Sequence, residues 1–387
     1  MYGRTKAVKI TMRIGIDGRA LQFRSWGGVR HYTLEFLQAL FTIDHANEYH
    51  VFYNAWKKIE VPRFSEFPNV HVHYSRWPNK FFNLSIKLFH APAFRPPDRL
   101  LDVLFVPNLN FVVCKMPTKL VAVVHDLSFE HFPEHFPWRF RLWHRTLNPR
   151  SLLQHADHII AVSEHTKRDL METYALSPER ISVIYPGIAD IRYWRLDIGQ
   201  QISNIKYPIS EAYILYFGAL EPRKNIEGLI GAYELLEEEM GQVPNLVIAG
   251  LTGAYTSRLK KRIRESQLRT RMYVKENPSE EEKATLYANA SLFVYPSFYE
   301  GFGFPPLEAM ARGVPVVASS ASSVPEVCGQ AALLVNPWNV SEIKTGMKIL
   351  LEDSTMRQKY IASGRAHVHR FSWTRCAQHT LEIVTHV

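Results

Sequence analysis

SLFVYPSFYEGFGFPPLEAMARGVPVVASSASSVP, residues 291–325, is the stretch from which the fold of this chain is inferred. The apolar run at 292–295 predicts a strand, after which a glycine-containing turn leads into a helix that begins with two prolines. Proline fits the first helical turn because the N–H groups there have no partner within the helix. The remaining N–H groups and the backbone of Gly301 and Gly303 form an anion cradle, which suits a phosphate.

Two carboxylates, Glu300 and Glu308, bracket this cradle in the sequence. A carboxylate repels a phosphate, so both side chains are better suited to neutral hydroxyl groups on either side of it. A ribose, a diphosphate and a hexose in a row have this arrangement of charge and hydroxyl groups. The segment therefore predicts a site for a nucleotide sugar.

The composition is that of a folded protein with about two domains, since 387 residues include 46% hydrophobic and 21% charged residues. A net charge of +9 favours anionic partners such as nucleotides, nucleic acid or acidic membrane surfaces. Cys114, Cys328 and Cys376 lack metal-site spacing and are expected to be reduced, which favours the cytoplasm. Because no Asp-x-Asp pair occurs, we expect no carboxylate-held metal at the diphosphate.

Neither a membrane-spanning segment nor a signal peptide is expected from the sequence. No apolar run approaches the ~20 residues that a transmembrane helix requires. The N-terminal residues are basic but have no apolar core of signal-peptide length, and a start at Met12 would precede the first strand. We therefore expect a protein that is not exported.

Short apolar runs alternate with helical stretches along the whole chain, which predicts two doubly wound α/β halves with parallel sheets. We expect an N-terminal domain at 1–190, a linker at 191–210 and a C-terminal domain at 211–370. The strands are predicted at 13–17, 49–53, 70–74, 103–106, 120–124, 158–162 and 181–185, and then at 213–218, 246–249, 272–274, 292–295, 314–318 and 333–335.

The first half offers two candidate contacts to a ligand, because ligands of such folds bind beyond the carboxyl ends of strands. Gly27 and Gly28 follow the first strand and permit close backbone approach, with Arg30 and Tyr32 at the start of the next helix. A flexible hinge with a solvated arginine is an equal alternative. His125 ends the strand VAVVH, just before Asp126, where a functional and a structural role remain open.

In the second half, a strand ending at Gly218 leads into the turn EPRKN at 221–225. Arg223 and Lys224 are placed to pair with a diphosphate, and charge-assisted hydrogen bonds contribute roughly 1.5–3 kcal/mol each. The alternative is a solvated basic turn. Two Ser-x-x-Glu patterns, at 279–282 and 323–326, predict capping boxes, so Glu326 is expected to cap a helix and not to take part in chemistry.

Two stretches combine aromatic and basic residues, at 76–99 and 136–150. An amphipathic helix with a buried stripe and shallow contact with an anionic bilayer are both consistent with them. Nucleic acid is the weakest reading, because no recognised binding motif accompanies the charge, and we expect none.

Several motifs together resemble the retaining glycosyltransferase family 4, which has the GT-B fold. They are FGALEPRKN, LVIAG, FVYPSFYEGFGFPPLEAMARGVPVVAS and SSVPEV in the second half, and RIGIDGR, GGVRHYT, VVHDLSFEHFP and HADHIIAVSEHTKRDL in the first. The resemblance implies two Rossmann-like domains that face a cleft, with the nucleotide held mainly by the C-terminal one. It also implies that the last helix, within 371–387, packs back on the N-terminal domain.

The resemblance implies individual roles for the matching residues. Glu308 would bind the ribose, Glu300 the donor sugar, and Arg223 with Lys224 the diphosphate. His125 would face the transferred sugar. The remaining donor-site candidates are Gly27, Gly28, Gly218, Gly301, Phe302, Gly303 and Phe304, and the acceptor-site candidates are Arg30, Tyr32 and Asp126.

Two departures from the family pattern concern the edge of the site. Asn277, Pro278 and Ser279 replace the usual glycine-containing loop beside the nucleotide base, and Gln330 stands where aspartate is frequent. The base is therefore not predicted by this loop.

We expect a metal-independent, retaining glycosyltransferase that moves a hexose to a hydroxyl of a glycan or glycolipid in surface polysaccharide biosynthesis. Mannose from GDP-mannose is one candidate donor, a UDP-sugar is another, and the inner face of the cytoplasmic membrane is a candidate location. Alternatives on the same fold are a nucleotide-sugar epimerase, a phosphorylase, or a non-catalytic nucleotide-binding or membrane scaffold. A phosphorylase would need a pyridoxal-bearing lysine motif, which we do not find.

Overall fold

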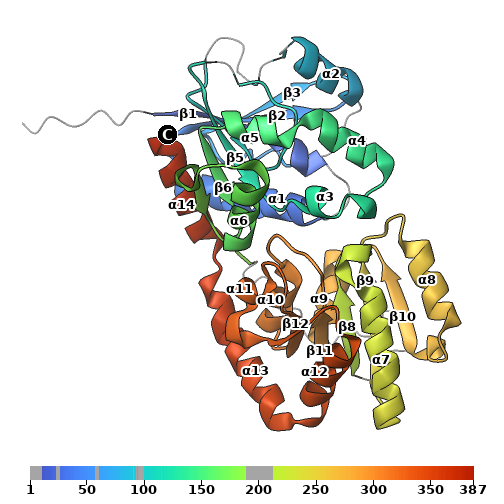
Figure 1. Ribbon diagram of the computed structural model, residues 1–387. Helices are drawn as coiled ribbons and strands as arrows, with labels where there is room; N and C mark the ends of the chain where they lie inside the picture. Colours follow the sequence, from blue (N-terminus) through green and yellow to red (C-terminus); the bar gives the residue numbers. More distant parts are fainter. Residues whose placement is uncertain are drawn as a thin grey trace, which may run out of the picture.

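The computed structural model describes residues 11–22, 27–56, 61–89, 91–92, 94, 100–114, 116–188 and 212–387. The expected linker at 191–210 lies outside these residues, as does part of the aromatic and basic stretch at 76–99. The described chain forms two parallel sheets, each covered by helices (Figure 1). This confirms the predicted class of two doubly wound, Rossmann-like halves.

The N-terminal sheet has seven strands in the order β3-β2-β1-β4-β5-β6-β7. Every pair of neighbours is parallel, and β1 lies between β2 and β4. The strands are β1 (Arg13–Asp17), β2 (Glu48–Asn54), β3 (Val70–Ser75), β4 (Val103–Val106), β5 (Lys119–Val124), β6 (His158–Ala161) and β7 (Ile181–Val183).

The C-terminal sheet has six strands in the order β10-β9-β8-β11-β12-β13, again all parallel. They are β8 (Tyr213–Phe217), β9 (Asn245–Gly250), β10 (Met272–Glu276), β11 (Ala290–Tyr295), β12 (Val316–Ser319) and β13 (Leu333–Val335). Residues of β8 and β11 are buried because helices cover both faces, which explains their continuous apolar sequences.

Fourteen α-helices are described. In the first half they are α1 (Gly28–Ile43), α2 (Asn79–Phe89), α3 (Ser128–His131), α4 (Trp138–Leu147), α5 (Pro149–His155) and α6 (Glu164–Tyr174). The second half continues with α7 (Ile226–Met240), α8 (Thr256–Glu265), α9 (Glu280–Ala288), α10 (Phe304–Ala311), α11 (Val324–Cys328), α12 (Val340–Glu352), α13 (Ser354–His367) and α14 (Trp373–His386).

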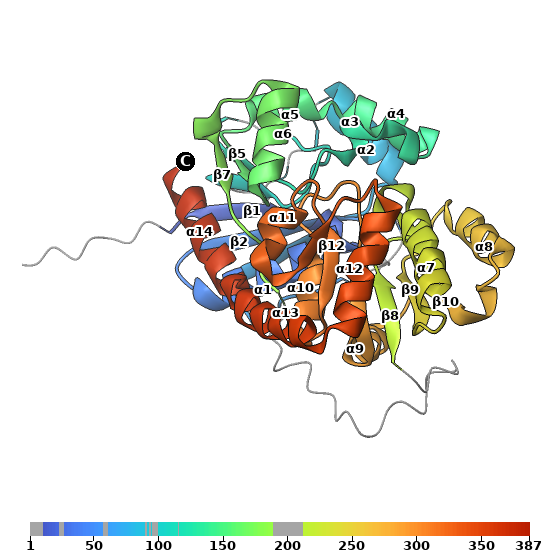
Figure 2. The same cartoon turned by 60° about the horizontal axis from the view of Figure 1, so that its bottom comes forward.

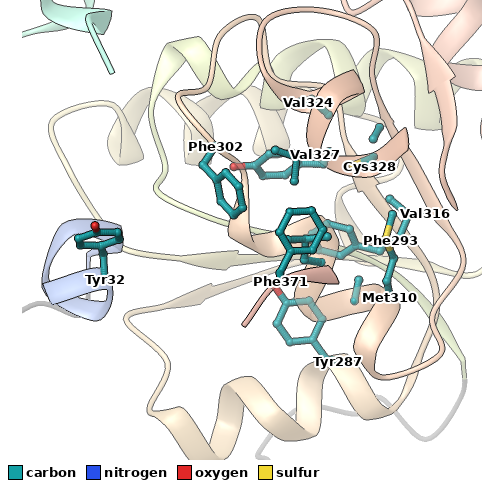
Figure 3. Packing of buried hydrophobic residues seen from close by; sticks show 14 of the residues in the cluster. Tyr32, Tyr287, Phe293, Phe302, Met310, Val316, Val324, Val327, Cys328 and Phe371 are labelled. Carbon is teal, nitrogen blue, oxygen red and sulfur yellow. The ribbon is translucent and has the colours of Figure 1, made fainter. Parts of the chain in front are cut away.

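The last helix, α14, lies against α1 of the N-terminal half (Figures 1 and 2). The rings of Tyr32 and Trp373 meet edge to face, with 5.5 Å between their centroids. Figure 3 shows Tyr32 on its own helix, apart from the C-terminal core, in which Phe293, Met310 and Val316 pack together. The chain therefore crosses between the halves twice, which ties the two cores to each other.

In each sheet the order of the strands reverses near the centre. The reversal lies between β1 and β4 in the first sheet and between β8 and β11 in the second. Ligands of doubly wound sheets bind outside the carboxyl ends of the strands at such a point. The loops that follow β1, β5, β8 and β11 carry the residues that the sequence singled out. The topology therefore brings these loops to the boundary between the halves.

One of the two predicted capping boxes is present, and the prediction of the other is wrong. Ser279 and Glu282 form the reciprocal bonds of a capping box at the start of α9. Ser323 does not cap α11 and instead donates to the carbonyl oxygens of Glu300 and Phe302, at 2.9 and 3.0 Å. Its expected partner, Glu326, caps a helix of the other half.

Two further findings on the described residues concern membrane-spanning helices and the cysteines. No helix among them combines the length and the apolar character that crossing a bilayer requires. Cys114, Cys328 and Cys376 are free thiols.

Candidate active site

A cavity of about 260 Å³ lies between the two halves. The N-terminal half contributes residues from the loops after β1 and β5, and the C-terminal half contributes the loops after β8 and β11 together with α10. The predicted site residues that line it are Gly27, Gly28, His125, Asp126, Gly218, Arg223, Lys224, Glu300, Gly301, Phe302, Gly303, Phe304 and Glu308. One space thus joins nearly all of the residues that the sequence placed in a common site.

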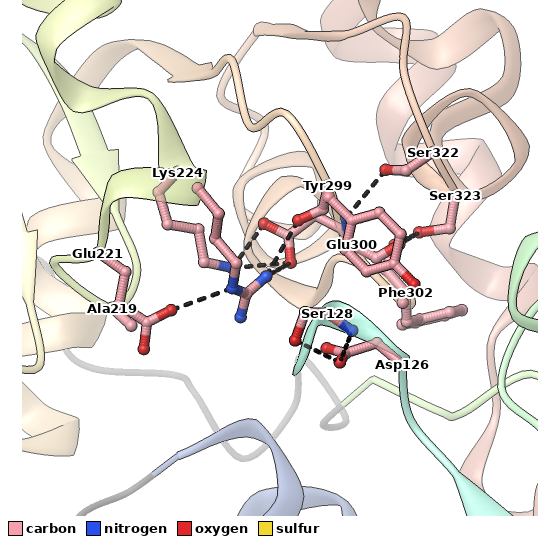
Figure 4. Close-up of polar contacts among 12 residues, drawn as sticks. Asp126, Ser128, Ala219, Glu221, Lys224, Tyr299, Glu300, Phe302, Ser322 and Ser323 are labelled. Carbon is pink, nitrogen blue, oxygen red and sulfur yellow. Dashed lines mark hydrogen bonds and ion pairs between the residues drawn. The ribbon is translucent and has the colours of Figure 1, made fainter. Parts of the chain in front are cut away.

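Glu300 forms the centre of a buried ion-pair cluster (Figure 4). Its two carboxylate oxygens accept hydrogen bonds from Lys224 Nζ at 2.5 and 2.7 Å, and Arg223 Nη1 donates to Oε2 at 3.2 Å. Lys224 also donates to the Tyr295 hydroxyl, at 3.2 Å. Both cations stand on the tight turn Pro222–Lys224, which Asn225 ends in the left-handed conformation before α7 begins.

The cluster is held in its charged form. Burial by itself would raise the pKa of the Glu300 carboxyl, but Lys224 and Arg223 outweigh burial and hold this pKa at about 2. Burial and the neighbouring Arg223 lower the pKa of Lys224, while Glu300 opposes that shift. The Arg223 pKa lies above its ordinary range because Glu300 and Glu221 outweigh its burial. The three groups therefore form a fixed array of charge at one end of the cavity.

Glu308 forms a second buried pair further along the cavity. Lys283 Nζ donates to Oε1 at 2.6 Å and the Tyr287 hydroxyl donates to Oε2 at 2.9 Å. Burial opposes ionisation of Glu308, but Lys283 and these hydrogen bonds lower its pKa overall. An ionised carboxylate has about four acceptor positions, so Glu308 retains capacity for hydroxyl donors from a ligand.

Two helix N-termini from opposite halves reach the cavity, those of α1 and α10. Each begins after a glycine, Gly27 or Gly303, and no side chain caps either of them. A Cβ atom added at Gly27, Gly28 or Gly303 would meet no atom of the described part of the chain within 4 Å, so these positions face open space there. Uncapped N–H groups and the positive ends of two helix dipoles make this space attractive to an anion.

His125 lies where the two halves touch. Its Nε2 donates to the Pro107 carbonyl at 2.8 Å, and burial lowers the pKa of the ring, so the imidazole is neutral. Gly301 packs so closely here that an added Cβ would lie 1.7 Å from the His125 carbonyl oxygen. Asp126 accepts from the Ser128 backbone at 2.9 Å and faces the Glu300 cluster from the opposite half (Figure 4).

Of the acceptor-site predictions, Tyr32 needs correction, and Arg30, whose charge lies near His31 and Glu280, stays a prediction. Neither Arg30 nor Tyr32 is among the described residues that line the cavity. Tyr32 is completely buried, because it occupies the inward face of α1 with Phe36. Its ring lies edge-on to His125, with 4.7 Å between centroids, so it can support that histidine but cannot touch an acceptor.

Sequence reasoning missed four polar residues of the cavity: His31, Glu280, Lys283 and Tyr295. Tyr295 ends β11, so the strand-end rule that singled out His125 could have found it. His31 is neutral because burial lowers its pKa to about 4. Burial raises the pKa of Glu280, which lies one helical turn before Lys283.

Within the described ranges, no three His, Cys, Asp or Glu side chains are grouped so that they could hold a metal ion. The positive charge in the cavity comes from Arg223, Lys224, Lys283 and the two helix N-termini.

Family models match both halves of the chain. The model described as "Glycosyl transferases group 1" matches residues 200–367, and the one described as "Glycosyltransferase Family 4" matches residues 26–191. O-antigen chain mannosyltransferase B from Escherichia coli is 33% identical over 300 residues, which cover 76% of this chain and 73% of the relative. Serotype-specific mannosyltransferase WbdA from Escherichia coli is 30% identical over 272 residues, 69% of this chain but only 33% of that relative.

A solved structure shares the arrangement of the two halves. Alr3699/HepE from Anabaena, in complex with UDP and glucose, has a TM-score of 0.71 at 17% identity. The comparison covers 97% of this chain and 100% of that one. The likeness confirms the GT-B fold that the sequence motifs implied.

Proposed function

The chain belongs to glycosyltransferase family 4 and acts as a glycosyltransferase of surface polysaccharide biosynthesis, and on that premise we propose that it transfers mannose from GDP-mannose. The acceptor is a hydroxyl of a growing glycan, and the anomeric configuration is retained. Two relatives named as mannosyltransferases support the choice of sugar. The observation that carries the proposal is the single cavity that joins the Glu300 cluster, two uncapped helix starts and His125.

We propose that the donor diphosphate lies between the starts of α1 and α10. Each helix end carries about half a positive charge, and the free N–H groups of both can donate to phosphate oxygens. The open space at Gly28 and Gly303 supports this position, since none of the described residues fills it. The N-terminal domain, within 1–190, would hold the acceptor, and the C-terminal domain, within 211–370, would hold the donor.

Arg223 and Lys224 would stabilise the leaving nucleotide. When the bond between sugar and phosphate breaks, negative charge grows on the diphosphate, and a preorganised cation acts where that charge develops. Glu300 keeps Lys224 oriented in the resting site at 2.5 Å. Because Glu300 is ionised and buried, we propose that it accepts hydrogen bonds from hydroxyls of the transferred sugar.

His125 would contact the transferred sugar from the opposite wall. Its Nε2 proton is engaged by Pro107, and its pKa lies below the ordinary value, so it is poorly suited to donate a proton. We propose that it orients sugar and acceptor rather than acting as a general acid. Asp126, next to it on the cavity wall, and Arg30 are the remaining acceptor-site candidates.

Glu308 and Glu280 would contact the nucleoside part of the donor. We propose that Glu308 accepts hydrogen bonds from the ribose hydroxyls and that Glu280 contacts the base. A carboxylate matches the adjacent N1–H and N2–H donors of guanine, whereas uracil presents one N–H between two carbonyl oxygens. This match supports a GDP-linked donor over a UDP-linked one.

The N-terminal half also carries a face suited to an anionic bilayer. On α2, Phe81, Leu84 and Leu88 share one side and are 66%, 50% and 58% exposed. On α4, Trp138 and Leu142 are 62% and 56% exposed. Both helices carry basic residues and no acidic one, and they lie side by side in Figures 1 and 2.

We propose that this aromatic-basic face, formed by α2 and α4, rests on the inner surface of the cytoplasmic membrane. Exposed apolar side chains enter the interface, and the basic residues are attracted to anionic lipids. A lipid-linked acceptor would then be held close to the site.

The test of the proposed reaction is a panel of nucleotide sugars that contains GDP-mannose, UDP-glucose and UDP-galactose. Thermal stabilisation should be largest with GDP-mannose, because a ligand that binds only the folded state raises its stability. Release of GDP should follow and should persist in EDTA, because protein groups supply the positive charge. A panel in which no nucleotide sugar stabilises the protein or releases nucleotide would overturn the proposal.

A further inference from the structure

Glu326 of the C-terminal half binds the first turn of α6 in the N-terminal half. The Glu164 N–H donates to Oε1 at 2.7 Å, and the His165 N–H donates to Oε2 at 3.1 Å. The first N–H groups of a helix have no partner within it. Glu326 thus satisfies two of them with both of its oxygens, across the boundary between the halves.

The same turn of α6 also holds the segment that contains Glu300. Ser163, fully buried at the N-cap, donates to the Gly301 carbonyl at 2.6 Å, and Thr166 Oγ1 donates to the same carbonyl at 3.2 Å. One turn later, Asp169 accepts a hydrogen bond from the Tyr299 hydroxyl. The first two turns of one helix therefore contact both residues that flank Glu300.

The two parts of the C-terminal half that meet α6 are joined to each other. Ser323, one residue before α11, donates to the carbonyl oxygens of Glu300 and Phe302, and Glu326 lies within α11 (Figure 4). The Glu300 N–H in turn donates to Ser322 Oγ at 2.9 Å. Residues 299–302 and 322–326 thus form one hydrogen-bonded unit, which docks on α6 through Glu326 and Gly301.

We propose that Glu326 is a positioning residue for glycosyl transfer, acting as an interdomain clasp on α6. It sets the position of the Glu300 segment relative to His125, which Gly301 touches directly. Glu326 is not among the described cavity-lining residues, so it acts through these contacts and not on the ligand. The inference rests on the proposed function, since transfer requires donor groups of one half to meet the wall of the other.

The chemistry of the clasp explains why a carboxylate stands at this position. Only an ionised carboxylate offers an acceptor oxygen to each of two adjacent N–H groups and also matches the positive end of a helix. In the variant Glu326→Gln the amide NH₂ would face one of the N–H groups, so one bond and the charge are lost while the size is kept. Nucleotide contacts within the C-terminal half are untouched by this change.

The experiment compares the wild type, Glu326→Gln and a matched control, Glu172→Gln, which removes an exposed carboxylate from the same helix. We expect kcat for Glu326→Gln to fall at least about tenfold on the donor that the wild type uses, while the Kd values for GDP and UDP by calorimetry change less than about twofold. Small-angle scattering of the nucleotide-bound variant should show a larger radius of gyration than the wild type. The control should match the wild type in all three measurements.

Two results would overturn the clasp. One is an unchanged kcat and an unchanged radius of gyration. The other is a parallel loss of kcat, nucleotide affinity and melting temperature, which would indicate a general loss of folding. If the wild type itself binds neither GDP nor UDP, the proposed function fails, and the same scattering comparison on the proteins without nucleotide still tests the clasp.

Discussion

Lys224 Nζ lies 2.5 Å from Glu300 Oε1, and both side chains are buried, at 7% exposure each. Sequence reasoning assigned the lysine to a diphosphate and the glutamate to a sugar, without pairing them. The pairing explains how the site keeps two cations and a carboxylate desolvated before the donor arrives. It also gives Lys224 a structural role beside the catalytic role that we propose for it.

We predict that Lys224→Met lowers both turnover and stability. Breaking a buried ion pair costs about 3–5 kcal/mol, and in this variant Glu300 keeps only Arg223 as a cationic partner, at 3.2 Å. The loss of a cation at the leaving group should lower kcat by about 100-fold or more. Nucleotide release assays and guanidinium unfolding measure the two effects. The control is Lys348→Met, which breaks the surface pair with Glu239 and should change neither quantity by much.

The lowered pKa of Glu300 should make the free energy of unfolding depend on pH. Its pKa in the folded protein is about 2, below the ordinary value of 4.5. A depressed carboxyl pKa stabilises the fold fully above about pH 4.5, and the contribution is lost as the pH falls toward 2. The shift corresponds to roughly 3 kcal/mol. Unfolding curves from pH 6 to pH 2.5 should show this loss in the wild type, and Glu300→Gln should lack that part of the slope. An identical slope in both proteins would contradict the assignment.

The sequence predicted the strands and the wall of the cavity well, for a physical reason. Buried parallel strands are short apolar runs bounded by glycine and proline, and their carboxyl ends converge by topology, so Gly218, His125 and Glu300 could be placed together. The contacts of Glu326 could not be foreseen, because its partners in α6 are about 160 residues away and no local pattern encodes them. Tyr32 was misassigned although the spacing of Tyr32, Phe36 and Leu40 marks a buried helical face.

The open space at Gly28 predicts a graded loss of donor binding. An added Cβ meets no atom of the residues that the structure describes, so Gly28→Ala and Gly28→Val should fold with nearly the wild-type melting temperature. Their side chains would occupy the position proposed for the diphosphate. We expect the Kd for GDP to rise from wild type to alanine to valine, by more than about tenfold for valine. Equal Kd values for the three proteins would place the diphosphate elsewhere.

The aromatic-basic face predicts salt-dependent membrane binding. The variant with Phe81, Leu84 and Leu88 replaced by serine should fold, since these side chains are at least half exposed. It should no longer sediment with phosphatidylglycerol vesicles, whereas the wild type should sediment at low salt and less at high salt. Trp338→Ser, which removes an exposed aromatic residue from the other half, is the control and should sediment like the wild type. Sedimentation of the triple variant at the wild-type level would count against the proposed membrane contact.

Glu280 predicts which base the enzyme prefers. Glu280 lines the cavity at the first position of α9, where Lys283 and Arg30 are its positively charged neighbours. If it accepts two hydrogen bonds from guanine, the wild type should bind GDP more tightly than UDP. Glu280→Gln should then weaken GDP binding by about tenfold to 100-fold, because bonds to a charged acceptor contribute roughly 1.5–3 kcal/mol, and should leave UDP binding nearly unchanged.

The matched control is Glu281→Gln, the exposed neighbour in the same helical turn, which should bind both nucleotides like the wild type. Calorimetric titration of the three proteins with GDP and UDP decides the matter, and an equal loss of affinity for both nucleotides in Glu280→Gln would show that this carboxylate does not select the base.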